Sequence, residues 1–291
     1  MPCTTGGGIV AAVRTAAHPG FDRAAVVLDG VALDACTERQ LVDTIIGEAG
    51  AQRGGWVVTV NLDILRSLRR DPALRALVDP ATFVVADGMP LLWAARLARR
   101  RLPARVTGSS LIWSLSAAAQ GGLSIYLLGG APGVPEAAAD ALLGGSPGLR
   151  VAGTDSPPLG FDADSAALDR VIRKARTAEP DIVFCGLGFP RQERVIAQLR
   201  VALPHAWFVG CGAAIPFAAG RQERAPRWMQ RSGLEWAHRL KCEPRRLFRR
   251  YIIKGVPYGA GLLLRSALRR SAPSGGARPA RRASRRLSQA G

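Results

Sequence analysis

Long apolar runs and histidines are scarce in this 291-residue chain, and each shortage excludes a class of protein. No stretch of roughly 18 residues is apolar throughout, as a membrane-spanning helix requires, so we expect the chain to meet a membrane only at its surface. The beginning of the chain lacks the charged segment and the apolar run of a signal peptide. The three histidines, His18, His205 and His238, have no serine or cysteine in a recognisable catalytic setting, so no hydrolase triad is proposed.

Cysteines are few, odd in number and widely scattered. The five are Cys3, Cys36, Cys185, Cys211 and Cys242. Because no Cys-x-x-Cys pair and no Cys/His cluster occurs, the sequence indicates neither a disulfide framework nor a zinc site. This pattern favours a reducing, cytoplasmic setting.

Acidic residues are outnumbered by basic ones, 22 against 40, which gives a formal net charge of +18. Such an excess indicates an acidic partner: nucleic acid, anionic lipid or a phosphorylated substrate. The bias is strong in residues 210–251, where aromatic side chains lie among the arginines. This mixture favours a phosphate or pyrophosphate ligand at a membrane interface, although a merely basic helical end is the alternative.

Short apolar runs alternate with longer helical patterns over residues 21–220. This alternation predicts an α/β fold, a Rossmann-like parallel sheet covered by helices on both faces. The predicted strands are 25–28, 56–60, 82–86, 123–128, 149–152, 181–185 and 206–209. The predicted helices are 37–49, 90–100, 109–120, 134–143, 165–177 and 191–201.

The two ends of the chain have different compositions from the core. After residue 220 the strand signal stops, and we predict a basic, mostly helical appendage over residues 221–270. Residues 271–291 carry five arginines and no acid, which predicts a disordered tail. Residues 1–20 are predicted to be a disordered extension.

Polar residues follow two of the predicted strands, where ligands of such sheets bind. Asp87 follows strand 82–86 and precedes Gly88, a position that suits a general base for an incoming hydroxyl group. An alternative role for Asp87 is the N-cap of the helix near Pro90. Thr59 and Asn61, which leave the neighbouring strand, could orient Asp87 or bind a sugar.

Glycines and charged residues occupy other loops of the predicted edge. The glycines of segment 129–133 can offer backbone N–H groups to a phosphate, or can form a tight turn. Gly188 precedes Arg191 and Gln192 at a predicted helix start, which suits a nucleotide diphosphate or a sugar hydroxyl. Neither loop is a full dinucleotide or Walker pattern, and this disfavours an oxidoreductase or an ATPase.

The Asp-Ala-Asp triplet at 162–164 invites a metal-bound sugar-nucleotide interpretation. However, the triplet directly precedes the predicted helix 165–177, where acids are ordinary first-turn residues. We therefore favour a capping role for it.

Eight short motifs occur in a characteristic order along the chain. They are Thr-Val-Asn at 59–61, Ala-Asp-Gly at 86–88, Arg-Val-Thr-Gly at 105–108, Leu-Gly-Gly at 128–130, Gly-Leu-Gly-Phe-Pro-Arg-Gln-Glu at 186–193, Arg-Ala-Pro at 224–226, Gly-Leu-Glu-Trp at 233–236 and a basic segment at 239–251. Together they resemble the WecG/TagA/CpsF family of bacterial glycosyltransferases over roughly residues 25–251.

The resemblance implies an inverting, metal-independent glycosyltransferase without a cofactor. Such an enzyme moves a hexose or N-acetylhexosamine from a UDP-sugar to a polyprenyl-diphosphate-linked sugar in cell-surface polysaccharide, teichoic acid or exopolysaccharide assembly. It implies a cytoplasmic protein held at the inner face of the plasma membrane, with an anionic membrane surface and no nucleic acid as partner. A homo-oligomer remains open.

The resemblance also implies roles for particular residues. By motif, Asp87 stands in the place of the catalytic base, with Thr59 and Asn61 beside it. The implied substrate-binding residues are Arg105, Gly129, Gly130, Gly188, Arg191, Gln192, Glu193, Arg239, Arg246, Arg249 and Arg250. The arginines of the appendage would hold diphosphate groups and close over the pocket. The sequence departs from the family at Arg191, which replaces the usual lysine, and at Pro216, where many members have an aspartate.

A second interpretation belongs to another class of protein. The arginines could make the chain a non-catalytic binder of anionic lipid or nucleic acid. Its binding would then collapse as salt rises and would show no preference for UDP-sugars.

Overall fold

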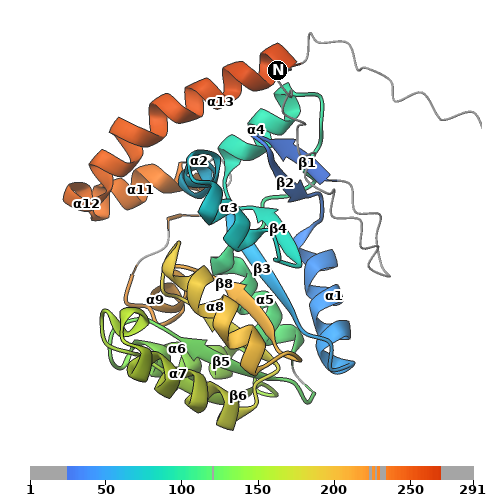
Figure 1. Ribbon diagram of the computed structural model, residues 1–291, viewed down its shortest axis with the longest axis vertical. Coiled ribbons are helices and arrows are strands. Elements are labelled where there is room, and N and C mark those ends of the chain that lie inside the picture. The colour runs from blue at the N-terminus through green and yellow to red at the C-terminus, as the bar shows by residue number, and fades with distance from the viewer. Residues whose placement is uncertain (1–24, 120, 223–224, 227, 230–233, 270–291) are drawn as a thin grey trace, which may run out of the picture.

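The computed structural model describes residues 25–119, 121–222, 225–226, 228–229 and 234–269 (Figure 1). The predicted extension 1–20 and the predicted tail 271–291 lie outside the described residues.

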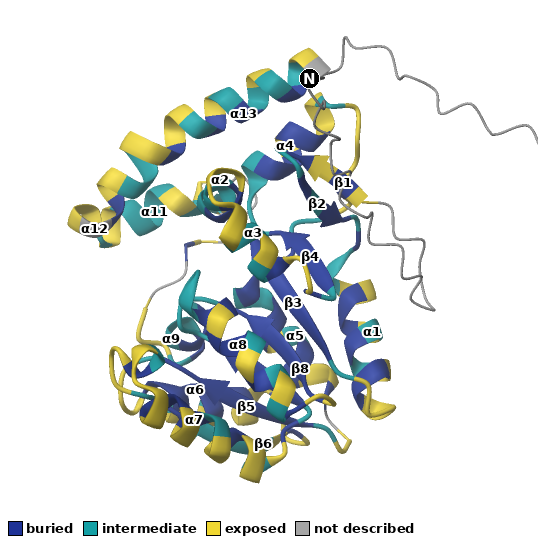
Figure 2. Cartoon of the chain, viewed as in Figure 1, coloured by how far each residue is buried: buried dark blue, intermediate teal, exposed yellow. Residues whose placement is uncertain are grey.

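A six-stranded parallel sheet forms the centre of the molecule, in the strand order β4-β3-β8-β7-β5-β6. Its strands are β3 (Gly55–Val60), β4 (Phe83–Ala86), β5 (Ser124–Leu128), β6 (Arg150–Asp155), β7 (Ile182–Cys185) and β8 (Trp207–Gly210). All but β6 are buried along their whole length, as Figure 2 shows for the middle of the sheet. This arrangement confirms the predicted Rossmann-like sheet.

Helices cover both faces of this sheet. One face packs against α2 (Leu62–Arg70), α3 (Pro72–Val78), α4 (Met89–Leu97), α7 (Ser165–Ala178) and α8 (Arg191–Ala202). The other packs against α1 (Glu38–Gly50), α5 (Gly108–Ala118), α6 (Val134–Gly145) and α9 (Ala214–Ala218). A short 3-10 helix, η1 (Phe161–Ala163), precedes α7.

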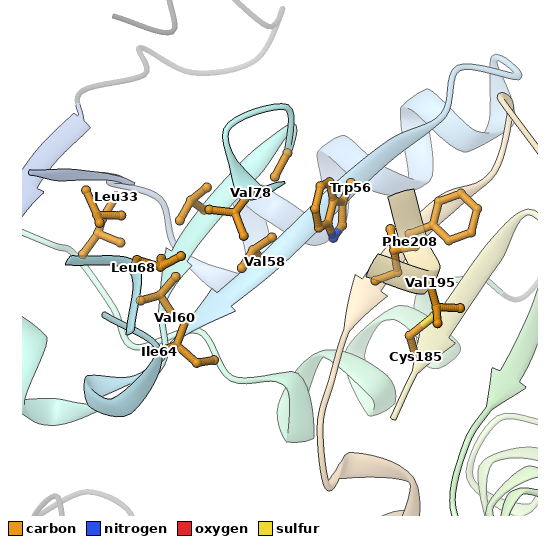
Figure 3. Close-up of a cluster of buried hydrophobic side chains, with 14 of the residues drawn as sticks. Leu33, Trp56, Val58, Val60, Ile64, Leu68, Val78, Cys185, Val195 and Phe208 are labelled. Carbon is orange, nitrogen blue, oxygen red and sulfur yellow. The ribbon is translucent and has the colours of Figure 1, made fainter. Parts of the chain in front are cut away.

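Alternation along each strand divides the core into two clusters. Trp56, Val58 and Val60 of β3 lie in the first cluster (Figure 3), whereas Val57 lies in the second. Full burial of one such side chain contributes roughly 1.5–3 kcal/mol to stability. Because both faces are apolar, the polar groups that the strands carry are restricted mainly to the strand ends.

The first predicted strand was placed wrongly in the parallel sheet. β1 (Ala25–Leu28) instead pairs antiparallel with β2 (Val31–Asp34) in a separate two-stranded sheet. Exposed and buried residues alternate along β1, as expected for a strand with one solvated face. The turn residues Asp29 and Gly30 have φ of 45° and 84°, which is the signature of a tight hairpin turn.

Two helices that the sequence analysis missed lie between β3 and β4. α2 begins after Asn61, whose side chain accepts hydrogen bonds from the first turn. α3 begins after Asp71, which caps it in the same way and is followed by Pro72.

The C-terminal appendage is helical, as predicted, over its last 35 described residues. It consists of α11 (Glu235–Cys242), α12 (Pro244–Phe248), the π-helix η2 (Arg249–Gly255) and α13 (Val256–Arg269). Helix α13 packs along α4, and η2 packs on α2. None of the described helices is long and apolar enough to span a membrane.

One buried carboxylate in the hairpin turn holds α13. The Asp29 side chain, 4% exposed, accepts hydrogen bonds from Tyr258 (2.8 Å) and Arg265 (2.6 Å) of α13 and from Arg69 (2.9 Å) of α2. Burial by itself raises the pKa of Asp29, but the hydrogen bonds from Arg265, Tyr258 and Arg69 outweigh it and lower the pKa below its ordinary value.

Replacement of Asp29 by asparagine should loosen α13. We expect the free energy of unfolding at pH 7 to fall by about 1.5–3 kcal/mol, because a charge-assisted network is lost. Since the pKa of Asp29 is lowered by folding, its stabilisation is present above the unfolded value of about 3.9 and disappears as pH falls through the folded pKa. Denaturant unfolding at several pH values measures both effects. Asp164→Asn, which alters an exposed helix cap, is the near-neutral control; an equal loss in both variants would contradict the anchor.

Candidate functional site

The carboxyl ends of the parallel strands bring the predicted site residues to one edge of the sheet. In the pairing of β3 and β4, Val60 lies opposite Ala86, so the next residues, Asn61 and Asp87, leave the sheet side by side. The backbone N–H of Asp87 donates a hydrogen bond of 2.8 Å to the carbonyl of Val60. The glycine loops after β5 and β7 end at this same edge.

Asp87 is half-buried at the end of β4, and it does not cap α4. The residue in the N-cap position is Gly88, with φ of 146°, a conformation that residues with side chains rarely adopt. The capping alternative for Asp87 is therefore wrong. Asp87 follows the last residue of β4, and its role as a general base stays a prediction.

Thr59 and Asn61, at the end of the neighbouring strand β3, form hydrogen bonds of their own. The buried hydroxyl of Thr59 donates to the carbonyl of Gly210 at 3.0 Å and so ties β3 to β8. The side-chain oxygen of Asn61 accepts from the backbone of Asp63 (3.1 Å) and Ile64 (3.0 Å) at the start of α2. Both side chains thus fix the end of β3 against its neighbours.

Arg105 links the appendage to the edge of the sheet where the strands end and Asp87 lies, which we call the Asp87 edge. The N–H of Val106 donates to the carbonyl of Ala86 at 2.9 Å, so the segment carrying Arg105 runs beside the end of β4. The guanidinium group of Arg105 donates to the Glu235 carboxylate of α11 at 2.9 Å, and both side chains are less than one-fifth exposed. A partly buried ion pair of this kind holds α11 over the strand ends.

Two appendage arginines complete this attachment. Arg250 lies with its Nε 2.9 Å from a carboxylate oxygen of Asp63, in the first turn of α2. Arg239 lies over the ring of Phe217 in α9, 5.6 Å from the ring centre. The appendage therefore contacts the elements that follow β3, β4 and β8. Arg249 is exposed, and the side chain of Arg246 lies outside what the structure describes.

Gln192 and Glu193 are buried at the start of α8, and their contact with a substrate stays a prediction. The side-chain oxygen of Gln192 accepts from the N–H groups of Gly188 and Gly212, both at 3.2 Å, and so joins the loops after β7 and β8. Its amide group donates to Glu193 at 2.8 Å. Because the two side chains are 3% and 0% exposed, they act here as supports for the loops.

The other loop residues take local partners. Gly129 has φ of 113°, and a Cβ there would lie 2.9 Å from the backbone of Gly186, so the loops after β5 and β7 approach closely. The carbonyl of Gly130 accepts from Ser156 at 2.8 Å. These contacts explain the glycines as a turn and a close approach. Phosphate binding by the loop stays a prediction.

The acidic triplet at 162–164 has capping and pairing roles. Asp164 accepts hydrogen bonds from the first turn of α7, which confirms its predicted capping role. Asp162 pairs with Arg191 at 3.2 Å. Within the described residues, no group of three or more His, Cys, Asp or Glu is arranged to hold a metal ion.

The sequence analysis did not identify two residues of the site that form ion pairs with its arginines. Glu235 lies inside the Gly-Leu-Glu-Trp motif, and Asp63 lies two residues after Asn61. Both are the acidic partners of arginines that the sequence analysis had assigned to substrate. An acid within a strongly basic segment was the available signal for Glu235.

Burial raises the pKa of Glu193 to about 7, although the hydrogen bond from Gln192 acts in the opposite direction. Between about pH 4.5 and pH 7, Glu193 keeps its proton in the folded protein and loses it in the unfolded chain. The free energy of unfolding therefore falls as pH rises through this range. We expect Glu193→Gln to remove this fall. The variant should gain about 3 kcal/mol over the wild type between pH 4.5 and pH 8 in denaturant unfolding.

Glu179→Gln provides the control, because Glu179 is exposed at the end of α7. Its unfolding free energy should follow that of the wild type across the same pH range. Parallel curves for Glu193→Gln and the wild type would contradict the raised pKa.

The arrangement described above has a counterpart among known proteins. The profile of the glycosyl transferase WecG/TagA/CpsF family matches residues 26–273, which include the sheet, the strand-end loops and the helical appendage. The match covers most of the chain. The protein therefore belongs to the WecG/TagA/CpsF family of glycosyltransferases.

Proposed function

We propose that this glycosyltransferase is an inverting, metal-independent enzyme that moves a hexose or N-acetylhexosamine from a UDP-sugar to a polyprenyl-diphosphate-linked acceptor sugar. The observation that carries the proposal is the half-buried Asp87 at the strand edge beneath an arginine-rich appendage. A carboxylate at the end of β4, together with arginines on an appendage that contacts the neighbouring loops and helices, offers what sugar transfer from a nucleoside diphosphate requires, namely a base and a neutraliser of leaving-group charge.

Inverting transfer assigns a direct role to Asp87. Its carboxylate takes the proton of the acceptor hydroxyl while the oxygen attacks the anomeric carbon from the side opposite UDP. The new glycosidic C–O bond forms as the bond between the anomeric carbon and the diphosphate oxygen breaks. UDP leaves with the bonding electron pair, and the proton ends on Asp87.

Arginines of the appendage stabilise the charge that grows on the departing diphosphate. We assign this role to Arg239, Arg246, Arg249 and Arg250, with Arg105 and Arg191 completing the positive rim. A guanidinium group suits a diphosphate because its planar fork can donate two parallel hydrogen bonds. In this conformation Arg105 and Arg250 are occupied by Glu235 and Asp63. Substrate binding would therefore exchange a carboxylate partner for a phosphate.

The remaining predicted residues support the pocket. Thr59 and Asn61 set the position of the strand ends beside Asp87, and Gln192 and Glu193 hold the loops after β7 and β8. Gly129, Gly130 and Gly188 supply backbone that can approach the nucleotide closely.

A lipid-linked acceptor requires the enzyme to work at a membrane surface. We infer that the protein is cytoplasmic and binds peripherally to the inner face of the plasma membrane, with the basic appendage facing anionic lipid. Its exposed aromatic residues, Trp228 and Phe248, and its arginines suit such an interface.

Asp87→Asn tests the assigned base. The substitution keeps the side-chain volume and removes the proton acceptor, so we expect transfer to fall at least about a hundredfold, the lower range for general-base catalysis. UDP binding and the unfolding midpoint should change little. The assay is transfer from UDP-sugars to a short-chain polyprenyl-diphosphate-linked sugar. Asp140→Asn, on α6, is the matched carboxylate control. Wild-type turnover by Asp87→Asn would retire the mechanism.

Removal of divalent metal tests the electrostatic part of the proposal. Transfer should persist in excess EDTA, because arginines take the place that a metal holds in other sugar-nucleotide enzymes. Loss of transfer on chelation, with recovery on addition of Mg²⁺ or Mn²⁺, would contradict it. The alternative of a non-catalytic polyanion binder predicts instead binding that falls steeply with salt and ignores the sugar nucleotide.

A further inference from the structure

A cavity of about 290 Å³ lies between the core helix α2 and the junction of η2 with α13. Arg66, Arg70, Ile253, Lys254, Pro257 and Tyr258 line it. The lining thus combines three cations with apolar side chains, and it contains no acidic residue. The volume is close to the lower end of the range for small-molecule sites.

The carboxylates around this cavity are each shared between two arginines. Asp63 contacts both Arg66 and Arg250. Asp29 contacts both Arg69 and Arg265. The junction therefore has four arginines, Arg66 of the lining among them, against two carboxylates.

Arg70 and Lys254 add to this excess. Within the described residues, neither side chain makes an ion pair, and both are exposed at the cavity. Asp71, the neighbour of Arg70, is engaged in capping α3. Cations gathered around one cavity repel each other, and an anion bound between them relieves that repulsion.

An exposed apolar face begins at the mouth of the same cavity. Ile253 lines the cavity and is also 58% exposed. Val256, Leu264 and Leu268 continue along α13, each more than half exposed, at spacings that keep them on one broad side of the helix. Figure 2 shows exposed stretches along α13. A helix with such a face and flanking basic residues lies in the plane of a membrane interface, with its apolar side toward the acyl chains.

We propose that this cavity is a headgroup site for an anionic phospholipid, in which Arg70, Lys254 and Arg66 contact the phosphate while Ile253 and Pro257 face the acyl chains. A phosphodiester joined to a hydrocarbon chain has the same division of charge and apolar surface as the lining. None of the six lining residues is among those assigned to substrate or catalysis, and the site deepens the proposed peripheral membrane binding, on which it rests. Arg66, which would contact the headgroup, shares the Asp63 carboxylate with Arg250 of the appendage. The headgroup would therefore lie next to the ion pair between Arg250 and Asp63.

Vesicle flotation of the full-length protein tests the site. The probe is phosphatidylcholine vesicles with and without phosphatidylglycerol, and the variant is Arg70→Gln with Lys254→Gln. We expect its partition onto the anionic vesicles to fall about thirtyfold, which corresponds to about 1 kcal/mol for each removed charge. The charge-preserving pair Arg70→Lys with Lys254→Arg should retain most of the partition.

The matched control removes the same charge elsewhere. Arg170 and Arg173 are exposed on α7, far from α13 in Figure 1, and the pair Arg170→Gln with Arg173→Gln should lower the partition less than about threefold. Equal losses in the two Gln pairs would show general attraction between a basic protein and an acidic surface, and would overturn the site. Unchanged partition of the Arg70/Lys254 pair would also overturn it.

Two further measurements complete the test. The first distinguishes a lipid headgroup from a soluble anion, and the second distinguishes the headgroup site from the proposed transferase site. Release from the vesicles by millimolar inorganic phosphate at constant ionic strength would assign the cavity to a soluble anion, against the lipid proposal. UDP binding by the Arg70/Lys254 variant should equal that of the wild type. A variant that loses vesicle binding but keeps UDP binding supports the headgroup site, whatever the outcome for Asp87.

Discussion

The pairing register of β3 with β4 is the constraint on which the site depends. Backbone hydrogen bonds fix Val60 opposite Ala86, and the N–H of Asp87 continues the ladder by one further bond to Val60. A slip by one residue would turn Asp87 toward the opposite face of the sheet. Burial of both faces prevents that slip, because neighbouring residues of a strand alternate between the two apolar clusters, one on each face of the sheet. The position of one carboxyl group is thus set by the core as a whole.

The appendage is held to this frame by a small number of charged contacts. Arg105 with Glu235 and Arg250 with Asp63 join it near the strand ends, while Asp29 holds α13 at a distance from them. A diphosphate that enters beneath the appendage would compete for the same guanidinium groups. The same contacts that close the appendage in the free protein are therefore suited to respond to a charged ligand.

Sequence patterns sufficed for the parts of the molecule that follow simple periodicity. The strands after β2 were located to within a few residues, because a strand buried on both faces is a continuous apolar run in the sequence. Asp87 was found because a polar residue directly after such a run is conspicuous, and Asp164 because it precedes a helical pattern. The family was recognisable from the order of its short motifs, which single positions would not have revealed.

The sequence did not reveal which polar side chains would form hydrogen bonds or ion pairs within the protein. Gln192 and Glu193 were predicted to bind substrate from their place at a helix start, but the sequence did not indicate that Gln192 joins two loops and donates to Glu193. β1 was misplaced because four apolar residues fit a parallel strand or a hairpin equally well, and the Asp29-Gly30 turn decides between them. The sequence could not identify the partners of Glu235 and Asp63, because each pairs with an arginine more than a hundred residues away in the chain.

Hydrogen exchange with and without UDP tests the central claim most directly, namely that the nucleotide binds at the Asp87 edge beneath the appendage. The account predicts slower exchange at the starts of α2 and α4 and across α11 to η2 when UDP is bound. Protection confined to other parts of the molecule, with no change at these segments, would contradict it.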